Sequence, residues 1–420
     1  MTSNTLRAFI LSQGEELLTG QTVDTNSTWL AEQVSGLGLR VVGGHTAGDV
    51  RADIAKAFEI GLDAADVVLC TGGLGPTEDD LTAEALADAM GLELHEDPEA
   101  LDQVRRRYER RGRAVPACHD RQALLPVGAV VLENRLGTAP AFMLAVPGRG
   151  TLFCMPGVPH EMKGIWADHI RPRLLSLPGV RPPLRWHFNT LGKGESQLQD
   201  ELRSIPDRFA GVRLGFRARM PGVQVKLEAD AGCIDFEEAV RWTRSELGVG
   251  CFSDAPGGDP EGTLAACVGD MLMERGERLA VAESCTGGLV AHLCITEPGS
   301  SRWLDRGAVT YSNKAKVDML GVQESTLIDE GAVSESVVLE MARGAAEEAG
   351  VDWGIATTGI AGPTGGSPEK PVGTVWIACV GPSGKRAKRL FLPTGSRTTT
   401  RIYSATIALD FLRRQILRSC

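Results

Sequence analysis

Residues 278–295 read RLAVAESCTGGLVAHLCI and predict a strand that turns sharply into a helix. The first apolar run ends at Ser284, and the pair Gly287–Gly288 stands where the next apolar run begins. Glycines permit the left-handed backbone that a tight turn between two such elements needs. A buried strand followed at once by a helix is the repeating unit of α/β proteins, so this stretch predicts an α/β fold.

The same alternation continues through the C-terminal part of the chain, from about residue 257 onward. Ser334 and Gly350 have the residue types that start and stop a helix. The linker GPSG at 381–384 joins two strand-like runs and predicts a β-hairpin. We expect the helices and strands of this part at 263–276, 334–350, 353–359, 373–380 and 385–393, with a last helix after 394–397.

A second region, from the start of the chain to about residue 175, has the same rhythm and predicts a parallel sheet with helices on its faces. Its strand-like and helix-like runs are 8–11, 26–38, 39–44, 50–65 and 66–73. The proline-rich stretch 176–184 breaks the pattern, and a smaller region follows with the order strand, helix, strands, helix. The sequence therefore predicts three domains, at 1–175, 176–256 and 257–420, of which the middle one is α+β and the others are α/β.

The composition is that of a folded, acidic protein. The 420 residues include 44 Lys and Arg against 54 Asp and Glu, a net charge of −10, and 43% are hydrophobic. This balance argues against general affinity for nucleic acid or anionic membranes. No apolar run approaches the roughly 20 residues of a membrane helix, and acids stand where a signal peptide has its apolar core, so we expect a cytoplasmic protein. The Cys and His residues form no zinc motif.

Ser284 is a candidate nucleophile because it lies between a strand end and a helix start. Free backbone N–H groups of Thr286, Gly287 and Gly288 at such a helix start are suited to hold an oxyanion. The alternative, weighted equally on this motif alone, is that Ser284 only caps the helix. A Ser–His–Asp triad is not supported, because His292 lies inside an apolar helical run.

Lysine is the candidate base. Lys314 and Lys316 fall together in VTYSNKAKVDML at 309–320, beside Tyr311. Two neighbouring cations lower each other's pKa, and burial lowers it further, so one amine is expected to accept the proton of Ser284. The alternative, which is the commoner situation for a lysine pair, is a solvated helix face.

Two further motifs favour an anionic ligand. The loop ATTGIAGPTGG at 356–366 ends a buried strand at Thr358, and Gly359 and the later glycines let the backbone approach a ligand closely. Arg397 and Arg401 stand at the opening of the last helix, where guanidinium groups and the helix dipole favour a phosphate or carboxylate. Glycine-rich turns and arginines are both common, so the joint occurrence carries the argument.

Together these motifs closely resemble the C-terminal domain of the CinA family, over about residues 259–420. The segments that carry the resemblance are AESCTGG (282–288), GAVTYSNKAKVDMLGV (307–322), GAVSE (331–335), TGIAGPTGG (358–366) and PVGTVWIA (371–378). The resemblance implies a Ser–Lys amidase that hydrolyses nicotinamide mononucleotide to nicotinic acid mononucleotide and ammonia without a cofactor.

The family's residue roles can be carried over to the matching positions. Ser284 is then the nucleophile and Lys316 the base, while Tyr311 and Thr358 orient Lys316. The resemblance also implies that Arg397 binds the mononucleotide phosphate, and a direct role near the carboxamide stays open as the alternative. Further contacts to the substrate are expected from Thr286, Gly287, Gly288, Gly359 and Arg401.

The N-terminal region has its own glycine-rich turn, CTGGLGPTEDDLT at 70–82. Its glycines, with Thr77, are suited to cradle phosphate, and Asp79 and Asp80 are suited to hold a hydrated divalent cation. The alternative is that both acids only favour a helix start. The spacing is not GxGxxG, so a Rossmann dinucleotide fold is not supported. The glycines concerned are Gly72, Gly73 and Gly75.

Residues 6–170 resemble the N-terminal domain of the same family, which is similar to molybdopterin-binding domains. The matching segments are GEELLTGQTVDTNS (14–27), HTAGD (45–49), GTAP (137–140) and MPGVPHEM (155–162). The resemblance implies metal-dependent hydrolysis of ADP-ribose to AMP and ribose phosphate. Mg²⁺ or a similar ion would be held by Asp79 or Asp80 with Asp24 or Asp49, and substrate by Asn26 and Gly157. Ala141 departs from the family, which usually has Gly there.

The middle region, 180–252, resembles the KH-like domain of longer family members. Its GKGE at 192–195 is a poor version of the loop that clamps nucleic acid, so a spacer or dimer contact is favoured. The family resemblance implies a homodimer. Two other functions stay open, namely a molybdopterin-binding enzyme and a competence or DNA-repair scaffold without catalysis.

Overall fold

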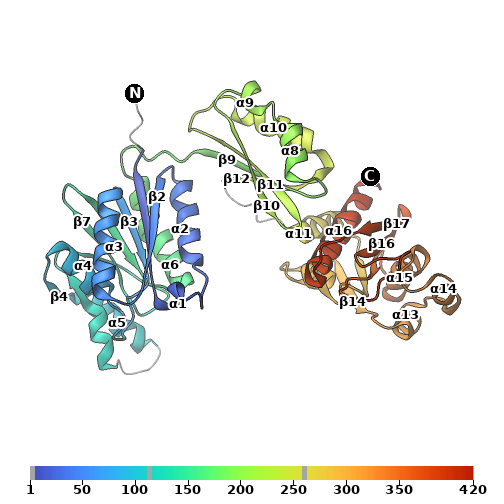
Figure 1. The fold of residues 1–420 in the computed structure, drawn as a ribbon, viewed down its shortest axis with the longest axis horizontal. Helices are drawn as coiled ribbons and strands as arrows, with labels where there is room; N and C mark the ends of the chain where they lie inside the picture. Colours follow the sequence, from blue (N-terminus) through green and yellow to red (C-terminus); the bar gives the residue numbers. More distant parts are fainter. Residues whose placement is uncertain (1–4, 111–115, 258–262, 420) are drawn as a thin grey trace. The chain divides into compact units, whose positions relative to one another are not determined.

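The computed structural model describes residues 5–110, 116–257 and 263–419. The chain divides into two compact units, 1–183 and 184–420, and the break falls inside the predicted proline-rich linker (Figure 1). Within the described residues, no helix is both long and apolar enough to cross a membrane.

A six-stranded sheet in the order β2-β1-β3-β8-β7-β6 forms the centre of the first unit. Its first four strands are parallel and carry the predicted pattern. The sheet is nevertheless mixed, because β7 runs antiparallel to both β8 and β6. A tight turn at Gly148, which has a φ of 77°, joins β7 to β8 and leaves no room for a crossover helix. The strands are β1 (Arg7–Gln13), β2 (Arg40–Ala47), β3 (Val67–Thr71), β6 (Val130–Leu132), β7 (Ala141–Val146) and β8 (Gly150–Met155).

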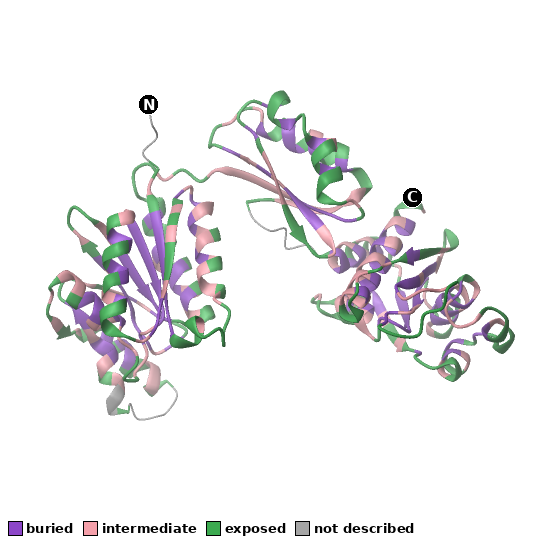
Figure 2. Cartoon of the chain, viewed as in Figure 1, coloured by how far each residue is buried: buried purple, intermediate pink, exposed green. Residues whose placement is uncertain are grey.

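Helices cover both faces of this sheet, and its central strands β1, β3 and β8 are largely buried (Figure 2). Phe58 of α3 packs with Phe9 on one face, and Leu30 of α2 packs with Ile10 on the other. The helices are α1 (Glu15–Leu18), α2 (Thr25–Gly36), α3 (Arg51–Ala64), α4 (Thr82–Met90), α5 (Pro98–Glu109), α6 (Pro159–Ile165), the π-helical turn Trp166–Ile170 and α7 (Arg171–Leu175). A small ribbon pairs β4 (Leu94–Glu96) with β5 (Leu124–Pro126), which follows the 3₁₀ segment Ala117–Ala123.

The second unit begins with an antiparallel sheet in the order β10-β11-β9-β12, which has an apolar cluster of its own around Phe188 and Val225. The predicted order strand, helix, strands, helix is found, and a further strand, which was not predicted, follows at Cys251–Pro256. Arg413 of the last helix donates to the carbonyl of Val249, so the predicted second and third domains lie in one unit. The elements are β9 (Leu184–Thr190), α8 (Glu195–Leu202), α9 (Ile205–Arg208), β10 (Arg213–Arg219), β11 (Gly222–Ala229), α10 (Phe236–Leu247), the 3₁₀ turn Gly248–Gly250 and β12 (Cys251–Pro256).

A five-stranded sheet in the order β14-β13-β15-β16-β17 follows, with apolar clusters on both faces. Helices α11, α12 and α16 contribute to one cluster, and α13, α14 and α15 to the other. The strands are β13 (Leu279–Glu283), β14 (Leu304–Val309), β15 (Trp353–Gly359), β16 (Thr374–Gly381) and β17 (Gly384–Phe391). The helices are α11 (Leu264–Arg275), α12 (Leu289–Ile295), the 3₁₀ turn Ser300–Arg302, α13 (Asn313–Leu320), α14 (Glu324–Glu330), α15 (Glu335–Ala349) and α16 (Arg397–Arg418).

The local predictions for this last part are confirmed. Ser334 caps α15 by accepting the N–H of Val337, and Gly350 ends that helix in the left-handed conformation. Strands β16 and β17 form the predicted antiparallel hairpin, with Gly381 opposite Gly384.

Candidate active site

The two predicted catalytic residues meet. Ser284 directly follows β13, and Lys316 lies on α13. The Nζ atom of Lys316 is 3.2 Å from the Oγ atom of Ser284, which is hydrogen-bond distance. The strand end and the helix therefore bring a hydroxyl and an amine together across 32 residues of sequence.

Lys316 is buried, with 1% of its surface exposed. Its Nζ also donates to the carbonyl of Thr310 at 2.8 Å. Burial lowers the pKa of Lys316, because taking an ammonium group out of water disfavours the charged form. Lys314 is exposed and pairs with Asp318 at 2.5 Å. The predicted mutual effect of the two lysines is therefore wrong: Lys314 lies on the solvated face, and burial alone accounts for the lowered pKa of Lys316.

The turn after Ser284 is tied to β15. The Ser284 N–H donates to the carbonyl of Thr357 at 3.0 Å, and the hydroxyls of Thr286 and Thr357 are 2.6 Å apart. Gly287 and Gly288 have φ angles of 61° and 90°, which residues other than glycine rarely adopt. The Gly287 N–H donates to the carbonyl of Ser284 at 3.2 Å, so the turn itself uses this predicted oxyanion donor. The same role for Thr286 and Gly288 stays a prediction.

The start of α12 is held by a residue that the sequence reasoning missed. The carboxylate of Glu283 accepts the N–H groups of Val290 at 3.0 Å and Ala291 at 2.9 Å. Gly288 is the N-cap, so Ser284 is not the cap of this helix. An acid inside an apolar run is a sequence signal, because a buried carboxylate must find donors.

Tyr311 and Thr358 do not orient Lys316 by contact. Thr358 donates its hydroxyl hydrogen to the carbonyl of Ala332 at 2.7 Å, and the Tyr311 hydroxyl accepts from Arg397 at 3.0 Å. The orienting contact that we assigned to them comes instead from the carbonyl of Thr310, which follows β14. A main-chain acceptor leaves no signal in the residue type.

Gly359, Arg397 and Arg401 also make specific contacts. A side chain at Gly359 would meet the carbonyl of Thr374 at 2.8 Å, so this glycine serves the packing of two strands, and its contact with the substrate stays a prediction. Arg397 donates to the carbonyl of Gly362 at 2.9 Å as well as to Tyr311. Arg401 donates twice to the carbonyl of Thr286, at 2.8 and 3.2 Å, and the contact with substrate that we predicted for it stays untested.

The glycine-rich turn of the first unit lines a cavity of about 390 Å³. Its lining contains the predicted residues Gly72, Gly73, Gly75, Asp49, Asp79, Asp80 and Gly157. It also contains Glu161, from the segment MPGVPHEM that carries the resemblance, and Gln13 and Glu16, which we did not predict. Asp24 is not part of this lining: it caps α2 by accepting the N–H of Ser27 at 2.9 Å. Of the two partners predicted for Asp79 or Asp80 at a metal, the lining of this cavity contains Asp49 only.

The remaining predicted residues of the first unit support the cavity wall. Asn26 donates to the carbonyl of Gly157 at 2.7 Å and to the hydroxyl of Thr71 at 3.2 Å, and so joins two strand ends. Thr77 donates its N–H to the carboxylate of Asp80 at 2.9 Å. Asn26 and Thr77 thus hold loops in place. The substrate contact that we predicted for these two side chains stays a prediction.

A divalent ion would take only some of its ligands from the residues of this cavity. Asp49 and Asp80 offer the carboxylate oxygens that Mg²⁺ prefers, and Asp49 already accepts the N–H of Glu15 at 3.1 Å. Among the described residues, no group of three His, Cys, Asp or Glu side chains is gathered to hold a metal. Mg²⁺ usually keeps several waters and takes one or two carboxylates plus substrate phosphates, and these residues fit that mode.

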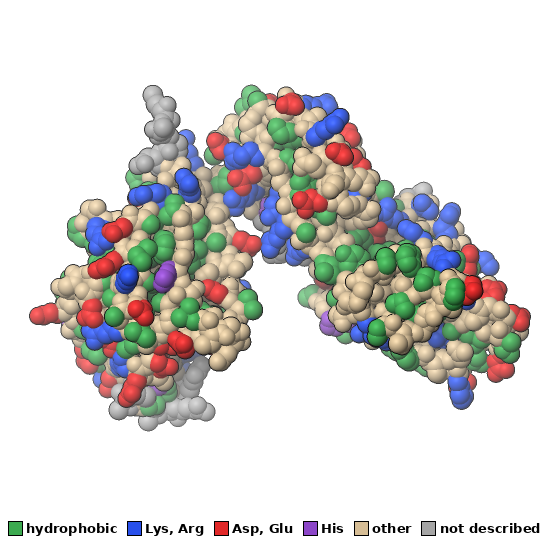
Figure 3. Space-filling view, viewed as in Figure 1, with side chains coloured by type: hydrophobic (Ala, Val, Ile, Leu, Met, Phe, Trp, Pro, Cys, Tyr) green, Lys and Arg blue, Asp and Glu red, His purple; other side chains and the backbone are tan. Residues whose placement is uncertain are grey.

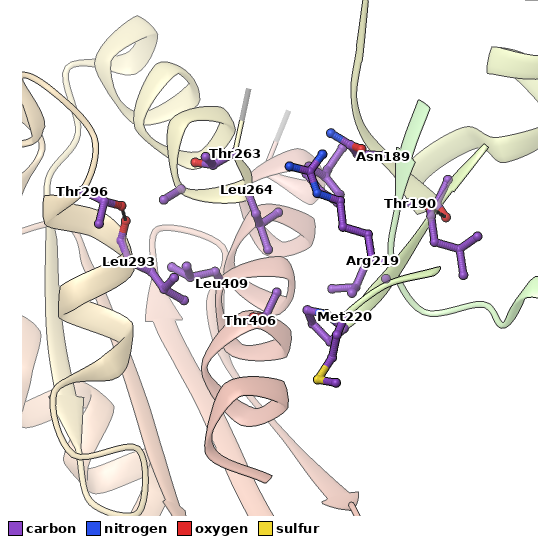
Figure 4. A pocket seen from close by; sticks show the side chains of 16 residues that line it. Asn189, Thr190, Arg219, Met220, Thr263, Leu264, Leu293, Thr296, Thr406 and Leu409 are labelled. Atoms are coloured by element: carbon purple, nitrogen blue, oxygen red, sulfur yellow. Dashed lines mark hydrogen bonds between the residues drawn. The ribbon is translucent and has the colours of Figure 1, made fainter. Parts of the chain in front are cut away.

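Another cavity, of about 410 Å³, lies in the second unit between β10, β11 and the helices α11, α12 and α16 (Figure 4). Met220 borders it on one side, and Leu293 and Leu409 on the other. Its lining contains none of the predicted site residues.

On the face of the first unit drawn in Figure 3, acidic and basic side chains are interspersed.

Two family profiles match the chain: "CinA C-terminal domain" matches residues 261–416, and "Probable molybdopterin binding domain" matches residues 9–176. A CinA-like protein of Anaeromyxobacter sp. (strain Fw109-5) is 43% identical over 418 residues, which cover 97% of this chain and 98% of that protein. A CinA-like protein of Shewanella loihica is 40% identical over 415 residues, covering 98% and 96% of the two chains.

Among solved structures, the competence/damage inducible protein CihA from Agrobacterium tumefaciens is 42% identical. The match covers 36% of this chain and 93% of the CihA chain, with a TM-score of 0.36. Because the two CinA-like relatives match this chain over 97% and 98% of its length, the chain belongs to the CinA family.

Proposed function

We propose that the second unit is an amidase that hydrolyses the carboxamide of nicotinamide mononucleotide to nicotinic acid mononucleotide and ammonia. The observation that carries the proposal is the 3.2 Å contact between Ser284 Oγ and Lys316 Nζ. Lys316 is buried and its pKa is lowered, so its amine is a proton acceptor at lower pH than an exposed lysine. The substrate follows from the family resemblance and not from the dyad itself.

The chemistry proceeds in two balanced halves. Ser284 Oγ bonds to the carboxamide carbon while its proton passes to Lys316 Nζ. That proton then goes to the leaving nitrogen as the C–N bond breaks and ammonia departs. Water next attacks the acyl ester, Lys316 takes up its proton and returns it to the released Ser284 oxygen, and the carboxylate product leaves. No cofactor is needed for these steps.

Arg397 is the proposed phosphate ligand. It stands at the first position of α16 and already holds Tyr311 and the loop carbonyl of Gly362, so it joins two segments that border the dyad. A guanidinium group has further donors beyond these two contacts and matches phosphate geometry.

The test is ammonia release and product chromatography with nicotinamide mononucleotide as substrate. Ser284→Ala and Lys316→Ala should each lower kcat by at least about 10²-fold, because each removes one half of the dyad. Lys314→Ala is the matched control, since Lys314 is exposed and paired with Asp318, and it should keep the wild-type rate. Wild-type kcat in Lys316→Ala would reject Lys316 as the base.

For the first unit we propose metal-dependent hydrolysis of the ADP-ribose pyrophosphate to AMP and ribose phosphate. The support is the cavity that joins three glycines of one turn to Asp49 and Asp80, a set suited to phosphates with a divalent ion. Asp49→Asn and Asp80→Asn should lower Mg²⁺-dependent AMP formation by about 10²-fold or more. Asp63→Asn is the control, because Asp63 is exposed and pairs with Arg149.

The same cavity has a second candidate ligand. The molybdopterin-binding profile over residues 9–176 favours a pterin, which would also place a phosphate against the glycine turn. Titration of the protein with a pterin phosphate and with ADP-ribose separates the two proposals. No AMP formation with Mg²⁺, together with tight pterin binding, would make this unit a pterin-binding module. The expected homodimer and the expected lack of DNA binding stay predictions for sedimentation and salt-dependent binding assays.

A further inference from the structure

The turn that carries Ser284 has little intrinsic rigidity. It contains the adjacent glycines Gly287 and Gly288, both with positive φ, and glycine restricts the backbone less than any other residue. Catalysis by a nucleophile and backbone donors requires the reacting groups to stay within a fraction of an ångström of their working geometry. Contacts from outside the turn must therefore fix it.

Arg401 supplies one such contact. Its Nη2 and Nε atoms donate to the carbonyl oxygen of Thr286 at 2.8 and 3.2 Å, from a helix 115 residues further along the chain. The Thr286 carbonyl and the Gly287 N–H belong to one planar peptide, so holding the oxygen also fixes the N–H that donates to the carbonyl of Ser284. A charged donor makes this a strong hydrogen bond.

Glu283 supplies the second contact, at the residue before the turn. Its buried carboxylate holds the first N–H groups of α12 through Val290 and Ala291. Its main-chain carbonyl accepts the N–H of Thr310 at 2.8 Å, and the carbonyl of Thr310 in turn accepts from Lys316. Glu283 is therefore linked both to the helix after the nucleophile and to the segment that holds the base.

We propose that Arg401 and Glu283 are positioning residues of the amidase, which fix the turn 284–288 through separate contacts and do not touch the substrate. The inference rests on the proposed function of the Ser284–Lys316 pair. It differs from the sequence expectation that Arg401 binds substrate. A positioning residue affects kcat, whereas a residue that binds the substrate equally in the ground and transition states affects KM.

Kinetics with nicotinamide mononucleotide test Arg401. Arg401→Met should lower kcat by about 10²-fold and leave KM within about threefold, because misplacement of the turn costs that much. Arg401→Lys keeps the charge and a donor, and should restore part of the lost kcat. Arg418→Met, an exposed change on the same helix, is the control. A tenfold higher KM with unchanged kcat, or no change in either, would overturn the role of Arg401.

Glu283→Gln tests the second residue with nearly the same shape. One acceptor oxygen is replaced by an NH₂ group that faces the N–H of Val290 or Ala291, so the helix start loses a hydrogen bond. We expect a lower kcat, by about tenfold or more, with KM unchanged. Wild-type kcat in a folded Glu283→Gln protein would overturn its positioning role.

Labelling of Ser284 by a fluorophosphonate separates this inference from the choice of substrate. The probe needs an activated serine and a held oxyanion, but no nucleotide. If wild type labels at Ser284 and Arg401→Met labels at least about tenfold more slowly, the positioning role stands even where no ammonia is released from the mononucleotide. Equal labelling rates in the two proteins would overturn it, whatever the substrate.

Discussion

At the residue scale, the buried amine of Lys316 decides what this site can do. Lys314, two positions earlier, has the same side chain but is exposed and ion-paired. The lysine pair by itself left the choice between them open, and the family resemblance pointed to Lys316. The structure adds that Lys316 is the buried one. The carbonyl of Thr310 and the hydroxyl of Ser284 are the partners of the buried amine. Its chemistry follows from those contacts and from the loss of water around it.

The lowered pKa of Lys316 predicts a pH dependence of the amidase reaction. The neutral amine is the base, so kcat/KM should rise with pH through the pKa of Lys316, which lies below the ordinary lysine value of 10.5. A pH–rate profile of wild type should show this rising limb, and Lys314→Ala should show the same one. If the rising limb moves to another pH in Lys314→Ala, Lys314 takes part in the titration, and the assignment of the limb to Lys316 alone is contradicted.

The same shift predicts how stability depends on pH. The folded pKa of Lys316 is lowered and the unfolded value is about 10.5, so between the two only the unfolded chain binds the proton. The contribution of Lys316 to the free energy of unfolding should therefore rise with pH across this window, by at most about 1.4 kcal/mol per pH unit. Lys316→Met should remove this slope in urea unfolding. An identical slope in the two proteins would contradict the burial argument.

At the element scale, close contacts of α15 position the helix that carries Lys316. A side chain at Gly344 of α15 would lie 1.9 Å from the carbonyl of Leu320, the last residue of α13. Gly354 of β15 is similarly tight against the carbonyl of Ala342. Small residues at these points therefore let α15 pack directly against α13 and the sheet.

Gly344→Ala should consequently destabilise the protein by about 1–3 kcal/mol, because the added methyl group forces α13 away from α15. Urea unfolding measures the loss. Arg343→Ala changes the exposed neighbour on the same helix and should stay within about 0.5 kcal/mol of wild type. Equal stabilities of the two variants would show that α13 and α15 separate at no cost.

Local elements were predictable from sequence because their signals are local. The caps Ser334 and Gly350 and the β16–β17 hairpin depend on residues within a few positions of one another. The antiparallel β7 and the partner of Asp24 were not predictable in this way. Strand direction and side-chain partners depend on the whole packed domain, as do the contacts of Glu283 and Arg401 across the turn.

At the scale of the whole molecule, the chain divides into two units that have separate apolar clusters and separate candidate sites. Each unit therefore contains the side chains of its own proposed reaction. The predicted boundary near residue 256 does not separate two units. Arg413 and Leu191 connect the sheets on either side of it.

Fragments test this division. Residues 184–420 should fold and keep the amidase activity, because the Ser284–Lys316 pair and its supports all lie within them. Residues 257–420 should unfold at a lower temperature, since Arg413 is 3% exposed and would lose the carbonyl of Val249. Thermal unfolding of both fragments is the measurement. Equal midpoints would contradict the coupling of the two sheets.

The central claim is that Ser284 and Lys316 act as one catalytic pair, and a double-mutant cycle of ammonia release tests it most directly. Wild type, Ser284→Ala, Lys316→Ala and the double variant are assayed together with nicotinamide mononucleotide. The pair predicts that each single change removes nearly all activity above background and that the second change adds no further loss. Losses that multiply in the double variant, or a single variant that keeps the wild-type rate, would contradict it.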